Sequence, residues 1–202
     1  MKSAGIALIA AIGIVAGILI YEARKPEPLR APTEAEVKTQ MDKLRADAVK
    51  RHPDMPQSDA MKEEAIRQGS AMLQKGNVET RALTAAGLFF GSYFINTRAR
   101  PEYCRKRGVD LAQFVAAYER AHGAELARAR EILARAGIDP ESMAPKLQAE
   151  FVTVVEQDMK DFAAGAQVQP ESACELFNQN SKIIAEAIVL PADVKQALMA
   201  TN

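Results

Sequence analysis

The feature that most restricts the fold of this chain is an uncharged apolar segment at its N-terminus. After Met1 and Lys2, the 19 residues from Ser3 to Tyr21 contain no charged side chain. A helix of that length spans about 28 Å, close to the roughly 30 Å hydrocarbon core of a bilayer. The segment predicts a transmembrane anchor over residues 1–23. A helix buried inside a globular core is one alternative.

A cleaved signal peptide is a second alternative for the same segment. Signal peptides end in a motif of small residues, which the peptidase requires. Tyr21 is too large for a cut after Ala23, and Pro32 disfavours a cut after Ala31. A cut after Gly17 is sterically allowed but falls inside the apolar run. We therefore expect an anchor that is not removed.

Basic residues on both sides of the segment bear on its orientation. Lys2 and the terminal amine favour a cytoplasmic N-terminus, whereas Arg24, Lys25 and Arg30 count toward the opposite orientation under the positive-inside rule. A two-residue head followed by an apolar run and a large domain is typical of a signal-anchor. We expect a single-pass inner-membrane protein with most of its chain in the periplasm, and the inverted topology is the alternative.

Two glycines inside the predicted anchor have the GxxxG spacing. Gly13 and Gly17 would lie on one helix face, where small residues let two membrane helices approach closely. The pattern indicates a homodimer contact, although small residues are common in membrane helices generally.

The chain after the predicted anchor reads as a linker followed by a helical domain. Residues 24–32 contain three prolines and predict a linker, and residues 33–202 predict a helical bundle domain. The chain is 48% hydrophobic but only 5% aromatic, and its 26 basic residues balance its 26 acidic ones. This balance argues against a nucleic-acid-binding surface. We expect an all-α bundle of five to six helices.

Local signals place the first helices of the bundle. Thr33 and Glu36 form a capping-box pattern, and Ser58 is suited to cap the second helix. The segment from Ala82 to Thr97 carries no charge and predicts a central, mostly buried helix. A second membrane contact is the alternative for this segment, but 16 residues are short for a span.

Prolines and glycines divide the second half of the chain. Pro101 predicts the first turn of a short helix, because proline is favoured at that position. One long helix is expected over residues 111–136. Further helices are expected from about Pro145 and from Pro170, with a break at 190–191 before a short terminal helix.

Cys104 and Cys174 are the two cysteines of the chain. Each lies about one turn into a helix that a proline begins, and 69 residues separate them. An even number of cysteines in an exported chain indicates a disulfide. Two separate buried thiols are the alternative, and the absence of a CxxC motif disfavours a redox-active pair.

Glu119, His122 and Glu125 are spaced three residues apart on the predicted long helix. Glu-x-x-His is half of a di-iron carboxylate motif, and the full site needs a second copy and two more glutamates. The other histidine, His52, has Val49 three residues before it, so the motif is incomplete. These residues are weak candidates for a zinc site with a remote ligand. We expect no metal and no cofactor.

Basic residues are densest directly after the predicted central helix. They are Arg98, Arg100, Arg105, Lys106 and Arg107. With Glu102 included, the segment carries a charge of +4 within ten residues, enough to attract an anionic surface or an acidic partner. A solvated loop whose arginines pair with glutamates is the alternative.

The sequence contains no motif that assigns catalytic residues. GxGxxG, GxxxxGK[ST], GxSxG and HExxH are all absent. We therefore expect no enzymatic activity, and we expect the protein to act through protein–protein interaction, as a scaffold, an envelope-complex component or an inhibitor-like binder. The alternative is a small-ligand or metal-dependent site around His122.

Overall fold

The computed structural model of the chain describes residues 33–200, and within them it contains helices but no β-strand. In chain order the elements are α2 (Glu34–Arg51), α3 (Gln57–Lys75), α4 (Val78–Phe94), the π-helical turn η1 (Ile95–Ala99), α5 (Arg100–Arg105), α6 (Ala112–Ala121), α7 (Gly123–Arg135), the 3₁₀ turn η2 (Pro140–Ser142), α8 (Ala144–Ala166), α9 (Pro170–Gln179), α10 (Ser181–Ala187) and α11 (Ala192–Met199). The predicted anchor, the linker and the Gly13–Gly17 contact lie outside the described residues.

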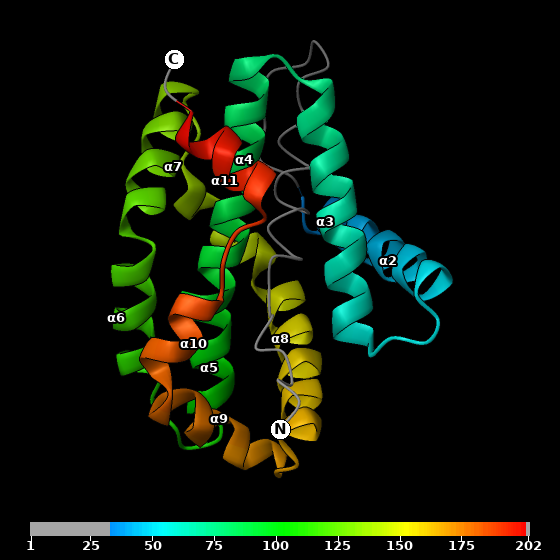
Figure 1. Cartoon of the computed structure of the whole chain (residues 1–202), viewed down its shortest axis with the longest axis vertical. Helices are drawn as coiled ribbons and strands as arrows, with labels where there is room; N and C mark the ends of the chain where they lie inside the picture. The colour runs from blue at the N-terminus through cyan, green and yellow to red at the C-terminus, as the bar shows by residue number, and fades with distance from the viewer. Residues whose placement is uncertain (1–32, 201–202) are drawn as a thin grey trace.

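Helix α4 is the centre of the domain. Every residue from Ala82 to Phe94 is buried, and the helix packs against α3, α7 and α11. Figure 1 shows it upright between α7 and α3, with α11 across it. This confirms the predicted central, buried helix. Between residues 33 and 200, no helix combines the length and apolarity needed to cross a membrane.

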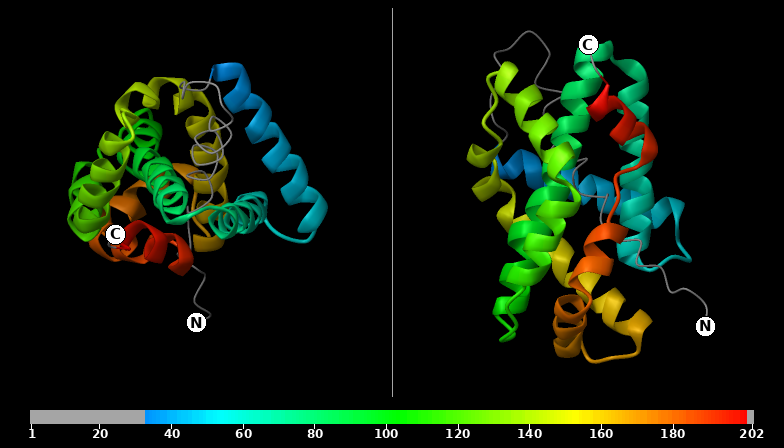
Figure 2. Two further views of the ribbon diagram at one scale, coloured as in Figure 1. Left: turned by 90° about the horizontal axis from the view of Figure 1, so that it is seen from above. Right: turned by 60° about the vertical axis from the view of Figure 1, so that its left-hand side comes forward.

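Helix α2 lies at the edge of the domain, as the view from above makes plain (Figure 2). It packs on α3 and α8 through a single buried face. That face consists of Val37, Met41, Leu44 and Ala48. The predicted capping box is confirmed, because the Thr33 hydroxyl accepts from the Glu36 N–H while the Thr33 N–H donates to the Glu36 carboxylate.

The helix predicted to begin at Pro101 is instead continuous with α4. The backbone N–H of Arg100 donates to the carbonyl of Ile95, five residues earlier, which is the π-helical pattern. Proline lacks an N–H and its ring collides with the carbonyl four residues before it in a regular α-helix. The wider π turn brings Pro101 into the helix without ending it, so α4, η1 and α5 form one rod.

The long helix predicted over residues 111–136 is broken at His122. The backbone of His122 has φ −114° and ψ 20°, outside the helical range, and α7 begins at Gly123. Helix α6 packs on α10, whereas α7 packs on α4 and α11. The break lets α6 and α7 pack against different helices. The prediction of a single long helix was therefore wrong. Breaks of this kind give the domain more and shorter helices than the five to six expected.

Ser58 does not cap the second helix. Helix α3 begins one residue earlier, after Pro56, and no side chain caps it. Ser58 lies within the first turn, and its backbone N–H donates to the Asp161 carboxylate of α8 at 3.1 Å. One free N–H group of this helix start therefore finds a partner in a neighbouring helix, which the sequence pattern does not show.

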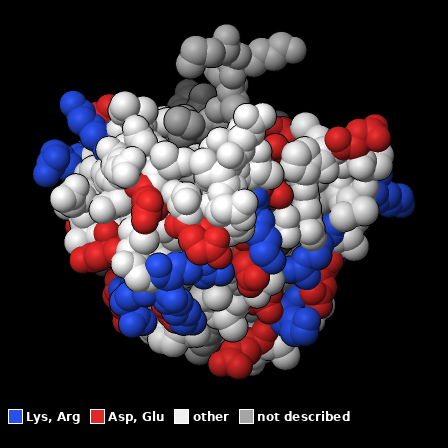
Figure 3. Space-filling model, turned by 90° about the horizontal axis from the view of Figure 1, so that it is seen from below, with Lys and Arg blue, Asp and Glu red and all other residues white. Residues whose placement is uncertain are grey.

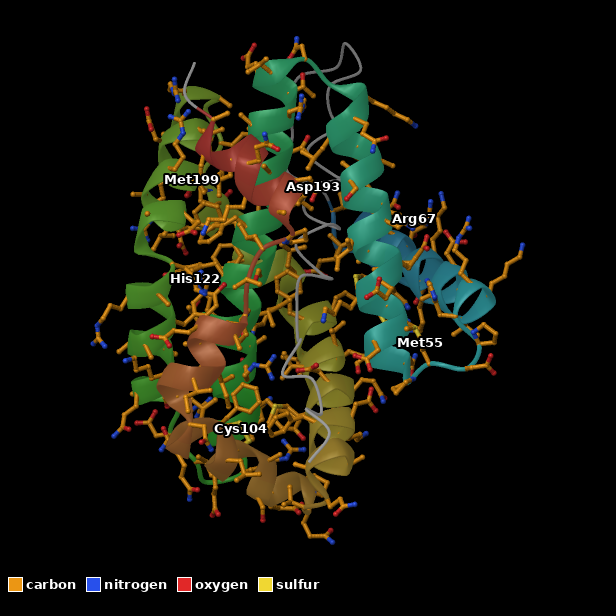
Figure 4. The ribbon with its side chains drawn as sticks, in the orientation of Figure 1. Met55, Arg67, Cys104, His122, Asp193 and Met199 are labelled. Atoms are coloured by element: carbon orange, nitrogen blue, oxygen red, sulfur yellow. A yellow bond between two sulfur atoms is a disulfide. The ribbon has the colours of Figure 1, made fainter. Side chains whose placement is uncertain are left out.

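The predicted disulfide is present and buried. The sulfur atoms of Cys104 and Cys174 are 2.06 Å apart, and neither residue is exposed to solvent. The bond joins α5 to α9, near the lower end of the domain as drawn in Figure 4. It closes a loop that contains α6, α7 and α8, and so it links the centre of the bundle to its C-terminal third.

We expect loss of this bond to destabilise the domain by about 4 kcal/mol, because cross-linking a loop of this length removes that much chain entropy from the unfolded state. Urea unfolding of the full chain in nonionic detergent, with and without reductant, measures the difference. The Cys104→Ser/Cys174→Ser variant is the control and should not respond to reductant. An equal midpoint for the oxidised and reduced wild type would contradict the expectation.

Candidate functional site

An arginine side chain is enclosed in the core of this domain. Arg100 follows the π turn directly, and none of its side chain is exposed. Its Nη1 lies 2.8 Å from the Oδ2 of Asp158 on α8 and 2.9 Å from the Sδ of Met159. Its Nε donates to the Oδ1 of Asn96 at 3.3 Å. Arg100 therefore belongs to a buried ion pair and cannot contribute to a surface cluster with its basic neighbours.

Aromatic and hydroxyl groups surround this ion pair. The guanidinium carbon of Arg100 lies 4.6 Å from the centre of the Phe177 ring on α9, a cation–π contact. On α6, the Tyr118 hydroxyl lies 3.2 Å from the Ser92 hydroxyl of α4. We call Arg100, Asp158 and these contacting side chains the buried charged centre. It brings together residues from α4, η1, α5, α6, α8 and α9.

The disulfide lies beside this centre because both use the same two helices. Arg100 is one helical turn before Cys104 on the rod, and Phe177 follows Cys174 by three residues on α9. The covalent bond and the cation–π contact therefore join α5 to α9 at successive turns. The disulfide therefore restrains α9 from moving away from α5, which would break the cation–π contact.

The ion pair is incompletely hydrogen-bonded. The Nη2 of Arg100 has no hydrogen-bond partner, and the Oδ2 of Asp158 accepts no well-aligned hydrogen bond despite its short contact with Nη1. Burial raises the pKa of Asp158 to about 6, although the charge of Arg100 acts in the opposite direction. Burial also lowers the pKa of Arg100, against the charge of Asp158. Desolvation thus outweighs mutual attraction for both groups.

The other basic residues of the predicted cluster have separate partners. Arg98 forms an ion pair with Glu141 and lies over the Phe94 ring, and Arg107 lies 3.5 Å from the centre of the Tyr103 ring. Of the five basic residues, Arg98, Arg105 and Lys106 are exposed to solvent, and Arg107 is half-buried.

Lys106 and Arg105 act together on one carboxylate. Lys106 lies 3.0 Å from Glu102, and its hydrogen bond is the main reason that the pKa of Glu102 is lowered. A hydrogen bond from Gln148 and the charge of Arg105 lower this pKa further.

On the face seen from below, basic and acidic side chains are interspersed and do not separate into zones (Figure 3). Ion pairing with glutamates therefore accounts for much of the local excess of positive charge.

The three weak metal candidates have three different partners. The Nε2 of His122 lies 3.0 Å from the carbonyl oxygen of Ala185, and Figure 4 shows His122 at the junction of α6 and α7. Glu125 forms an ion pair with Lys195 of α11 at 2.7 Å. Glu119 accepts a hydrogen bond from the Tyr93 hydroxyl at 2.8 Å. Among residues 33–200, no group of three or more potential ligands could hold a metal ion.

Two surface cavities are shallow and lie away from these residues. One, of about 180 Å³, lies between α4 and α7, with Arg128 and Arg135 on its rim. The other, of about 290 Å³, lies where α2, α3 and α8 meet, and its lining includes Met61, Arg45 and Lys160. Neither is lined by His122 or by the buried charged centre.

Comparison with models of known protein families, with curated proteins and with solved structures found no match for this chain.

Sequence reasoning missed the buried charged centre, although the spacing contained a signal for it. Asn96, Arg100 and Cys104 are four residues apart and so follow one helix face. A cysteine predicted to form a core disulfide at one end of that face implies that Arg100 also points inward. Asp158 lies on α8 within the buried series that includes Val155 and Met159.

We expect the two charges of the centre to be strongly coupled. Asp158→Ala and Arg100→Met should each destabilise the domain by about 3–5 kcal/mol, because each leaves a buried charge without its counter-charge. Replacing both, as in Arg100→Met/Asp158→Leu, should cost far less than the sum and could stabilise the domain by about 1–4 kcal/mol. Urea unfolding of all three variants measures the coupling. Additive losses would show that the two side chains do not interact.

We expect His122 to have a structural role. His122→Ala should lower stability by about 1–3 kcal/mol, because it leaves the Ala185 carbonyl without its partner. It should change no metal content, which elemental analysis of the purified wild type and variant checks. Stoichiometric zinc in the wild type that is lost in the variant would contradict this role.

Proposed function

We propose that this chain is a membrane-tethered protein of the periplasm whose helical domain acts by binding another protein. The apolar N-terminal segment supports the tether, and the helical domain at residues 33–200 supports a compact body at its end. The role that fits this design is that of a scaffold, an envelope-complex component or an inhibitor-like binder.

The buried Cys104–Cys174 disulfide is the observation that carries the proposed compartment. Disulfides form and persist in oxidising compartments and are rare in the cytosol. Both cysteines are fully buried, and the bond links helices that are far apart in the sequence. Such a bond needs an oxidising environment while the domain folds, before its burial protects it.

The positions of Arg100, Asp158 and His122 favour a protein-binding function over a catalytic one. Arg100 and Asp158 are enclosed, and the Nε2 of His122 contacts a backbone carbonyl, so none of these groups is presented to a substrate. A general acid, base or ligand-binding group must reach the molecule on which it acts. With these groups engaged in the protein itself, the outer helix surfaces are what remains for function.

We expect the full-length chain to fractionate with the inner membrane and to resist alkaline extraction, because 19 uncharged residues are enough to cross the bilayer core as a helix. Protease added to spheroplasts should degrade the domain. A non-reducing gel should show faster migration than a reducing gel, with Cys104→Ser/Cys174→Ser as the control that migrates equally in both. Full-length chain in the cytosol with two free thiols would overturn the proposal.

We expect a protein partner to be found by crosslinking and mass spectrometry in native membranes, and we expect the exposed basic residues to contribute to its binding. Arg105→Glu/Lys106→Glu should reduce crosslinking to an acidic partner by about tenfold, because charges at the rim of an interface control the association rate. Lys50→Glu/Lys75→Glu makes the same charge change at two other exposed helix ends and is the matched control. Equal crosslinking by both variants would remove the basic residues from the proposal.

A further inference from the structure

Helix α11 lies in a groove that α3, α4 and α7 form. Figure 4 shows Asp193 at the start of this helix and Met199 at its other end, toward α7. Its buried side chains are Val194, Ala197 and Leu198. Apolar anchors at positions i, i+3 and i+4 are the pattern by which an amphipathic helix fills a groove of another protein. The domain therefore contains a helix-binding groove, and its own last described helix occupies that groove.

Two polar contacts from α7 orient α11. The Glu125 carboxylate, which is largely buried, lies 2.7 Å from the Nζ of Lys195. Arg128 donates from Nε to the Leu198 carbonyl at 3.3 Å and from Nη2 to the Ala200 carbonyl at 2.7 Å. The last carbonyls of any helix lack intrahelical partners, whatever its sequence. Arg128 therefore recognises a helix end, and Glu125 recognises a basic side chain one residue after the first apolar anchor.

Few contacts hold α11 in place. The helix has eight residues, and isolated helices shorter than about 12–15 residues are marginal in water. Residues 188–191, which join it to α10, form no helix, and Val189 among them is 66% exposed. No described helix follows α11, so its departure from the groove breaks no connection between other described helices.

The groove continues beyond the end of α11. Because Glu125 contacts Lys195 and Arg128 contacts the residues that follow, α7 and α11 run in the same direction at this contact. The next turn of α7 supplies Ile132 to the cavity of about 180 Å³, and α4 supplies Leu83. Arg128 lines the same cavity, which therefore begins where α11 ends.

A helix one turn longer than α11 would use this cavity. Its next anchor, seven residues after the first, lies on the same helix face and points toward the apolar lining of the cavity. Helix α11 ends at Met199, five residues after its first anchor Val194, and so it ends before that position. The groove therefore fits a longer helix better than the one it holds.

We propose that this groove binds an amphipathic helix of a partner protein, and that α11 is an intramolecular occupant which the partner helix displaces. The partner helix has apolar side chains at positions i, i+3, i+4 and i+7 and a basic side chain at i+1. This inference rests on the proposed protein-binding function and specifies its site and the class of its partner.

Competition with α11 makes the groove selective. A segment joined to its site by a short linker has an effective concentration in the mM range, so weakly binding helices are excluded. The fourth anchor gives the partner helix a contact that α11 lacks. One buried leucine side chain strengthens binding about tenfold or more, which favours a helix with all four anchors over α11.

Zero-length crosslinking tests the groove. The probe is an isotope-labelled peptide of residues 188–200, extended by a leucine at the i+7 position and one further helical turn. Carbodiimide joins a lysine to a carboxylate that it contacts, so the probe lysine should become linked to Glu125 of the full chain in nonionic detergent. The intramolecular link between Lys195 and Glu125 should decline as the probe adduct increases. Mass spectrometry separates the two products.

A matched peptide and two chain variants are the controls. The probe with Val194→Asp/Leu198→Asp lacks two anchors and should form at least about tenfold less adduct. In the full chain, Lys195→Gln removes the pair that holds α11 and should increase the probe adduct. Lys182→Gln, at another exposed lysine that pairs with a glutamate, should not change it.

Two results would overturn the proposal. One is a probe that links to Glu125 no more than the control peptide does, or that leaves the intramolecular link unchanged at saturation. The other is a Lys195–Glu125 link between ¹⁵N-labelled and unlabelled chains mixed without probe, because it would assign the groove to a second copy of the chain.

Crosslinking in native membranes separates this proposal from the proposed function. A partner that is linked there only to other surfaces would refute the groove and leave the protein-binding function intact. Probe binding without any partner in native membranes would support the groove and refute the function.

Discussion

The enclosure of a guanidinium group in an apolar core is the constraint on which the arrangement of the domain depends. A buried charge is tolerated only where counter-charge, hydrogen-bond acceptors and polarisable groups surround it. Arg100 receives these from α8, from the π turn and from α9, while hydroxyl groups of α4 and α6 lie nearby. The helices that meet at this point are held in one relative position, because a shift of any of them would leave a charge without compensation.

The disulfide and the ion pair act on the same helices by different physics. The covalent bond limits the unfolded chain and stabilises the fold mainly in that way. The ion pair, by contrast, is no clear source of stability, since desolvation affects both of its members more than their attraction does. We infer that the pair specifies which helices meet, because a shift of either helix would separate two buried charges.

Much of the helical pattern could be predicted from the sequence, because local signals dictate it. The Thr33–Glu36 capping box, the uncharged α4 and the cysteine pair were recognisable from residue type and spacing. The break at His122 was not, because the reason for it is the change of neighbour from α10 to α4 and α11. The continuity through Pro101 was missed for a related reason, since a π turn depends on backbone geometry that residue type alone does not reveal. The charge of Arg100 predicts a surface position, whereas its place on the helix face of Asn96 and Cys104 leads into the core.

The π turn sets the rotation of everything that follows it on the rod. Its hydrogen bond from Arg100 to Ile95 spans one residue more than a regular α-helical turn, and each residue of a helix advances by about 100° around the axis. If the same residues of Ile95–Ala99 adopted ordinary α geometry, Arg100 and Cys104 would turn by roughly that angle around the rod. The guanidinium group would lose Asp158 and the thiol would lose Cys174 in a single step. The π geometry of this segment is therefore as strict a requirement as the identity of the residues that follow it.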